Sequence, residues 1–179
     1  MLEQTIYFSS FIIITFLIIL FHELGHYIIG RLSGIAKENI KILFSFPPDT
    51  ALKNWDGDWL TSSNMDEYLK VYSKFDPRHD FLYYFLSGGL FLETVFVVII
   101  SILIFLSPIP NLYLLLLAFL SIFINLVYVL IDMINTIRKN EPAGDISTMW
   151  LFSPKLTALI FFLFFTLRFA IIMIDVYLL

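Results

Sequence analysis

The chain has 179 residues, of which 59% are hydrophobic and 18% aromatic. Soluble domains contain about 45–50% apolar residues, so this composition excludes an ordinary soluble protein and indicates an integral membrane protein. The formal net charge of -4 identifies no partner, and no basic patch with interleaved aromatics supports binding to nucleic acid. Because the chain has no cysteine, any metal must be held by His, Asp or Glu.

Four apolar runs are long enough to cross a hydrocarbon core, which takes about 20 helical residues. They predict membrane helices at 6–30, 81–106, 111–137 and 155–179. The first run is too long for a signal peptide and no basic residue precedes it, so we expect it to stay on the mature protein. The proline-rich turn "SPIPN" predicts that the second and third helices form an antiparallel hairpin. Without repeats or linkers, the sequence predicts one domain over residues 1–179, an all-α polytopic membrane protein.

Residues 31–80 form a charged insert between the first two runs. In "IKILFSF" apolar and polar residues alternate, which predicts a short strand at 40–46 that ends at two prolines. Apolar residues recur at helical spacing between Met65 and Phe75 and predict an amphipathic helix. Two placements of this helix are equally favoured: on the inner leaflet, or packed against the rest of the insert.

Basic residues are confined almost entirely to two regions. Ten of the 11 Lys and Arg residues lie in the insert or around the loop that follows the third run. The positive-inside rule therefore predicts that both regions are cytoplasmic and that both termini lie outside.

The first run contains "HELGH", in which His22 and His26 are one helical turn apart. Two imidazoles on one face of a helix can bind one metal ion, and Glu23 beside them can reach a metal-bound water. This is the H-E-x-x-H arrangement, in which zinc lowers the pKa of its water and the glutamate takes the proton. Simple packing of polar residues between helices is the alternative, and it is disfavoured because ionisable groups at membrane depth are costly. His26 lies about 6 Å from the cytoplasmic end of the helix, so we expect the active site to face the cytoplasmic side.

The stretch "HELGHYIIGRLSG" resembles the zinc-binding helix of the site-2 protease family of intramembrane metalloproteases. "SGGLF" at 87–91 is similar to the family's small glycine-containing segment, and "PAGDIS" at 142–147 resembles its Asp-Gly element. In this chain Asp145 is followed by isoleucine rather than glycine. The resemblance implies a zinc endopeptidase in which two histidines and an aspartate hold Zn²⁺ and Glu23 acts as general base and then acid.

Two aspartates compete to be the third metal ligand. Asp132 lies near the cytoplasmic end of the third run, at the depth of His26, so depth alone permits it. The resemblance favours Asp145, and a carboxylate on a loop can swing toward a metal more readily than one fixed on a helix. We therefore expect Asp145 to be the ligand and Asp132 to orient a histidine through its other ring nitrogen.

The resemblance also implies that the substrate is a membrane-embedded or membrane-adjacent peptide, either the anchor of a regulatory protein or a small precursor. The 40–46 strand, with Ile42 and Phe44, offers an edge to which an extended substrate can add, although a hairpin without substrate contact is equally favoured. Family members place an asparagine shortly before the aspartate. Asn140 is close to Asp145 but lies in a charged loop, whereas Asn125 lies on the third run, 20 residues before Asp145. Asn125 is the substrate-binding candidate of the two.

Two further charges lie inside the apolar runs. Glu93 and Arg168 are at similar depth, about 18–20 Å from the cytoplasmic boundary, and we expect them to form a structural ion pair. Two other functions stay open: a non-catalytic membrane scaffold or immunity-type subunit with a structural zinc, and a zinc hydrolase acting on a non-peptide substrate. The intact Glu23 argues against the scaffold, which needs no general base. The bilayer is an expected partner, and a membrane protein partner or a second copy of the chain is left open.

Overall fold

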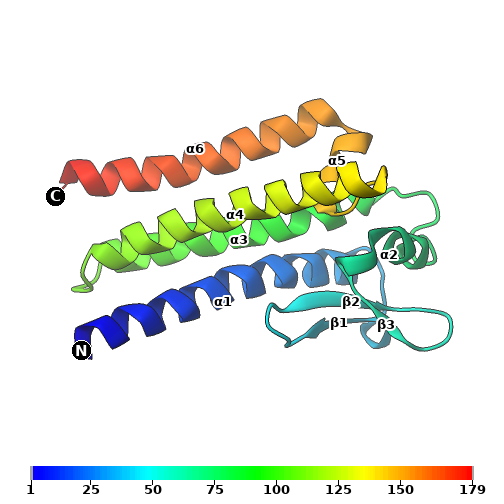
Figure 1. Cartoon of the computed structure of the whole chain (residues 1–179), viewed down its shortest axis with the longest axis horizontal. Coiled ribbons are helices and arrows are strands. Elements are labelled where there is room, and N and C mark those ends of the chain that lie inside the picture. Colours follow the sequence, from blue (N-terminus) through cyan, green and yellow to red (C-terminus); the bar gives the residue numbers. More distant parts are fainter. Residues whose placement is uncertain (1, 179) are drawn as a thin grey trace.

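The computed structural model describes residues 2–178, with side chains described for residues 4–174 and for Tyr177. Its main feature is a set of four long helices that run side by side: α1 (Leu2–Leu32), α3 (Leu82–Phe105), α4 (Leu112–Lys139) and α6 (Pro154–Leu178) (Figure 1). All four are long and apolar enough to cross a membrane. The four predicted runs are therefore confirmed as helices, with bounds that shift by a few residues. The last predicted residue, 179, lies outside the described residues.

The elements divide between the two ends of the bundle (Figure 1). The two chain termini and the turn between α3 and α4 lie at one end. The small sheet, the short helix α2 (Met65–Tyr72) and the short helix α5 (Asp145–Phe152) lie at the other. The predicted antiparallel hairpin of the second and third runs is confirmed.

Helices α1 and α3 approach each other closely through glycines. A Cβ atom added at Gly25 of α1 would lie 2.1 Å from the carbonyl oxygen of Gly88 on α3. No real side chain tolerates such a contact, and a Cβ atom at Gly88 would in turn lie 2.7 Å from Cγ1 of Ile29 and 3.0 Å from the Gly25 carbonyl oxygen. Both positions therefore favour glycine where the two backbones meet. Gly88 belongs to the "SGGLF" segment, whose small residues therefore permit this close helix packing.

The insert carries a three-stranded antiparallel sheet with the order β1 (Ile40–Leu43), β2 (Asp49–Lys53) and β3 (Trp59–Leu60). Ile40 pairs with Leu52, and Leu52 pairs in turn with Leu60. The predicted strand was too long, because β1 ends at Leu43. Beyond it the chain turns, and the Ser45 hydroxyl donates to the Pro47 carbonyl. β2 and β3 were not predicted, since strands of five and two residues give little periodic signal.

The tip of the β1–β2 hairpin lies along α1. Phe46 stacks on Phe16 of α1, with ring centroids 6.4 Å apart and ring planes within 3°. Phe44 and Phe46 are otherwise exposed. The turn between β1 and β2 is therefore held beside the apolar part of α1, where Figure 1 shows the sheet extending along that helix.

Helix α2 packs against the protein. Its buried residues include Tyr68 and Tyr72, whose rings stack on or tilt against Phe85 of α3. The apolar face of α2 therefore packs into a core that includes Ile40 and Leu52 of the insert and Phe85 of α3. This agrees with the predicted packing on the insert, while the leaflet placement stays a prediction. The insert also contains two short 3₁₀ turns, at Lys37–Asn39 and Ser62–Asn64.

Candidate metal centre

His22 and His26 lie on the face of α1 that packs against α3, with ring centroids 4.9 Å apart. Together with Glu23 they form a group whose ligand atoms all lie within 4.8 Å of one another. A His-Glu-His cluster with this spacing can bind a metal ion. The one-turn separation in the sequence therefore brings both rings to one point.

The hydrogen bonds of the two rings decide which nitrogens face that point. The Nδ1 atom of His26 is 2.8 Å from the Phe85 carbonyl oxygen, and the Nδ1 atom of His22 is 3.2 Å from Glu93 Oε2. A carbonyl oxygen and an ionised carboxylate oxygen can only accept hydrogen bonds. Both Nδ1 atoms must therefore be the donors and carry the proton. In the neutral rings the lone pairs are then on the Nε2 atoms, as a metal requires.

Asp145 joins the histidines from the first position of α5. Its Oδ2 atom is 3.1 Å from His26 Nε2 and 3.7 Å from His22 Nε2, and it accepts a hydrogen bond of 2.9 Å from the Tyr128 hydroxyl. In the metal-free centre, burial raises the pKa of Asp145, but the charge of the adjacent histidines and the hydrogen bonds from them lower it by more, so the carboxylate is ionised. The structure thus brings the predicted third ligand to both Nε2 atoms.

Asp132 does not take the place that the sequence predicted for it. The Nδ1 partners of the histidines are Glu93 and the Phe85 carbonyl, so the expectation that Asp132 orients a histidine was wrong. Its carboxylate instead accepts hydrogen bonds from Thr136 and Ser147. The reason is the direction of α5, which places Ser147 against α4.

A glycine keeps space open beside the two nitrogens. A Cβ atom at Gly89 would lie 2.6 Å from the Nε2 atoms of both His22 and His26. Any side chain at this position would occupy the room next to the lone pairs. The site therefore fits a metal ion in three respects: converging nitrogens, an ionised carboxylate and a space without a side chain.

Glu23 is anchored by the insert. Its Oε2 atom accepts a 2.7 Å hydrogen bond from the Thr50 backbone N–H, and the Thr50 hydroxyl donates to the Glu23 carbonyl oxygen at 2.8 Å. Thr50 lies on β2 and is buried. The sheet therefore fixes the carboxylate of Glu23 beside the histidines, without placing a positive charge on it.

Glu93 connects three helices to the site. Its Oε1 atom accepts hydrogen bonds from Asn125 Nδ2 at 2.6 Å and from Arg168 Nη2 at 2.8 Å, while Oε2 faces His22. The predicted Glu93–Arg168 pair is confirmed, and both side chains are 1–2% exposed. The pair was expected to be structural, but the contact with His22 also makes Glu93 the group that orients a candidate ligand.

Two cavities adjoin Glu23. A void of about 10 Å³ lies between Glu23, His26, Asp49 and Asp145, close to the volume that one water needs. A larger cavity of about 310 Å³ lies between α1, α4 and the hairpin tip. Half of its lining residues are aliphatic or proline: Ile18, Ile19, Pro47, Pro48, Ile124, Val127 and Ile131. The other half is polar: His22, Glu23, Asp49, Ser62, Glu93, Asn125 and Tyr128.

The predicted substrate-binding residues lie in different places. Asn125 lines the larger cavity, although its amide nitrogen is engaged by Glu93 and by the Ser121 carbonyl. Ile42 and Phe44 line neither of the two cavities, and Phe44 is 76% exposed beyond the end of β1. The structure therefore brings Asn125 to the histidines and leaves the other two on the hairpin.

Sequence reasoning missed Tyr128, Thr50 and the Phe85 carbonyl. One signal for Tyr128 was available, because polar residues recur on one face of α4 at helical spacing: Ser121, Asn125, Tyr128 and Asp132.

Comparison of the chain with protein-family models, with curated proteins and with solved structures gives no match. A function can therefore be inferred only from the geometry of these side chains.

Proposed function

We propose that the chain is a zinc-dependent intramembrane endopeptidase of the site-2 protease type. One observation carries the proposal: both imidazoles are held through Nδ1, so that both Nε2 atoms converge beside Asp145 Oδ2, with Glu23 adjacent. Two nitrogens and one carboxylate form a ligand set that suits a catalytic zinc with an open position. His22, His26 and Asp145 would hold the ion.

Glu23 is the proposed general base. When bound, zinc supplies Lewis acidity at the reacting carbonyl. The Glu23 carboxylate accepts a proton from the attacking water, whose oxygen adds to the carbonyl carbon of the scissile peptide. Glu23 then delivers the proton to the amide nitrogen as the C–N bond breaks, which leaves a free carboxyl and a free amine. The Thr50 N–H holds the carboxylate in place for both transfers.

The surroundings of the site support a peptide in a membrane as substrate. Half of the residues that line the cavity of about 310 Å³ beside His22 and Glu23 are aliphatic or proline, which suits an extended segment with apolar side chains. All four long helices have the composition of membrane spans, and the basic residues favour a cytoplasmic insert. The outer edge of β1 is not paired within the sheet and can take an added strand.

Replacing the base separates catalysis from metal binding. Glu23→Gln should keep one zinc per chain and lower the cleavage rate by about 10²–10⁴-fold, because the amide cannot take the proton. The assay incubates the zinc-loaded protein in micelles with a panel of single-span membrane peptides and detects fragments by mass spectrometry. Cleavage by the parent and none by the variant would support the proposal. A parent that holds zinc and cleaves no peptide would favour the scaffold function, and equal cleavage by Glu23→Gln would rule out this role for Glu23.

A further inference from the structure

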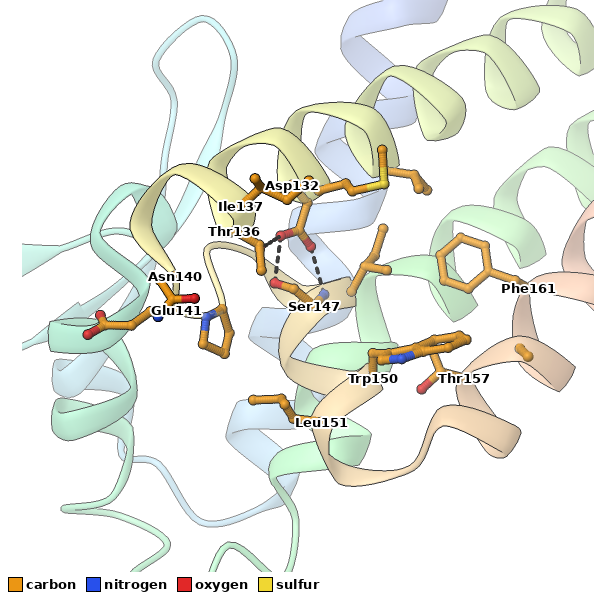
Figure 2. A pocket seen from close by; sticks show the side chains of 15 residues that line it. Asp132, Thr136, Ile137, Asn140, Glu141, Ser147, Trp150, Leu151, Thr157 and Phe161 are labelled. Carbon is orange, nitrogen blue, oxygen red and sulfur yellow. Dashed lines mark hydrogen bonds between the residues drawn. The ribbon is translucent and has the colours of Figure 1, made fainter.

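Asp132 forms a clasp between α4 and the start of α5, which Figure 2 shows as dashed lines. Its Oδ2 atom accepts a 2.8 Å hydrogen bond from the Ser147 backbone N–H. Its Oδ1 atom accepts from the Ser147 hydroxyl at 2.6 Å and from the Thr136 hydroxyl at 3.2 Å. Asp132 is 4% exposed, so this carboxylate is directed at α5 rather than at solvent.

The clasp supplies a cap that α5 lacks. Gly144 occupies the N-cap position and has no side chain with which to accept a hydrogen bond from the first turn. The N–H of Ser147, the third residue of the helix, is one that an N-cap side chain normally satisfies. Here the acceptor comes from a different helix, at Asp132.

Gly144 is also required for the clasp to close. A Cβ atom at this position would lie 2.7 Å from Asp132 Cγ, so a side chain would displace the carboxylate. The Ser147 hydroxyl oxygen accepts in turn from the backbone N–H groups of Ala143 and Gly144, at 3.0 and 3.2 Å. The turn that leads into α5 is therefore tied to the same serine that Asp132 holds.

The contacts between Asp132 and α5 also determine the position of Asp145, the first residue of that helix. Two groups from α4, one turn apart, define its place: Asp132 holds the helix backbone through Ser147, and Tyr128 donates to its Oδ2 atom. No contact of Asp132 reaches the histidines directly in the described part of the chain. Asp132 thus acts on the candidate centre only through α5.

We propose that Asp132 is a positioning residue that holds Asp145 at the metal centre by capping α5 from α4. This inference rests on the proposed zinc site. Removing a group that orients a metal ligand typically lowers metal affinity by about 10–100-fold. Asp132→Ala should therefore raise the zinc dissociation constant by about that factor, whereas Asp132→Asn should stay within a few fold of the parent because an amide oxygen can still accept from Ser147 N–H.

The test is a zinc titration of the purified full chain in micelles against a competing chelator. It compares the parent with Asp132→Ala, Asp132→Asn, Asp145→Ala and the Asp132→Ala/Asp145→Ala double variant. If Asp132 acts through Asp145, the double variant should bind zinc no more weakly than Asp145→Ala alone. Additive losses in the double variant, or a parental dissociation constant for Asp132→Ala, would overturn the inference.

A matched control separates positioning from general destabilisation. Asp76 is also buried and accepts from the backbone N–H groups of Asp80 and Phe81 at the start of α3. Asp76→Ala should lower thermal stability without changing the zinc dissociation constant. If Asp132→Ala does not fold, Ser147→Ala carries the test, because it removes one of the two contacts and should weaken zinc binding several-fold. If the parent binds no zinc, the proposed function is refuted. If the parent binds zinc and both Asp132→Ala and Ser147→Ala have the parental dissociation constant, this inference alone is refuted.

Discussion

The two ends of the helix bundle differ in what they bury. Toward the turn between α3 and α4, the core is aliphatic: Ile18, Val97, Ile104, Leu114, Leu117 and Leu120. Toward α5, the protein buries a histidine, three carboxylates and an arginine, with a second histidine, His22, half-buried beside them: His26, Glu93, Asp132, Asp145 and Arg168. Val97 of the aliphatic end and Glu93 of the charged end are only one helical turn apart on α3. Burial of apolar side chains explains the stability of the first end. Burial of charged groups is costly, so their presence at the second end indicates a functional role.

The two ends also differ in how their side chains are held in place. In the aliphatic end each side chain contributes packing, and neighbours can partly relax when one is trimmed. In the charged end each group is held by partners on other helices, as Glu93 is by Asn125 and Arg168. Losing one member therefore leaves another unpaired, which a buried charge tolerates poorly.

Removing Glu93 is the most direct way to test this contrast. Glu93→Ala leaves Arg168 buried without its carboxylate and should cost about 3–5 kcal/mol of unfolding free energy. It should also weaken zinc binding, because His22 loses the group on its Nδ1 atom. Unfolding in mixed micelles and a zinc titration provide the two measurements.

Two further variants control that result. Val97→Ala, one turn away on α3, should cost about 2 kcal/mol and leave the zinc affinity unchanged. Arg168→Met combined with Glu93→Ala should cost less than the sum of the single changes, because no unpaired charge is left. Additive losses would show that the Glu93–Arg168 contact has no energetic role.

A smaller effect is expected from Asp49, which lies beside the centre on β2. Burial and, next, the charge of Glu23 raise the pKa of Asp49 from 3.8 to about 6. The folded protein therefore holds this proton more tightly than the unfolded chain, and the stability of the metal-free protein should fall as pH rises from about 4 to about 6. Asp49→Asn should remove that fall and add on the order of 1–2 kcal/mol at pH 7, after allowance for partial exposure.

The measurement is the unfolding free energy of the metal-free parent and variant at several pH values. Asp56→Asn is the control, because Asp56 is an exposed carboxylate on the same sheet's second turn. Equal pH dependence in the parent and in Asp49→Asn would contradict the assigned environment of Asp49.

Local patterns in the sequence predicted much of this structure. Continuous hydropathy defined the four long helices, and the i, i+4 spacing brought His22 and His26 together, because both signals lie within one element. The sequence did not predict where β1 ends, nor the strands β2 and β3. Short paired strands depend on partners elsewhere in the chain.

The candidate site was only partly predictable for the same reason. The partners of the two histidines are separated from them by 59 and 71 residues, so no local pattern encodes them. Depth along α4 matched Asp132 to His26 and so made it a competitor of Asp145, but depth does not say which way a carboxylate points. The direction of α5 separates the two aspartates, and it depends on tertiary contacts around Gly144 and Ser147.

Zinc content tests the central claim that the charged end of the bundle is a metal centre. The protein is purified in micelles, equilibrated with Zn²⁺ and freed of excess ion, and zinc per chain is measured by elemental analysis for the parent, His22→Ala, His26→Ala and Asp145→Ala. We expect one zinc per chain in the parent, near-complete loss in each histidine variant and strong depletion in Asp145→Ala, because these three side chains converge. A parent without zinc, or histidine variants that keep one zinc per chain, would contradict the account.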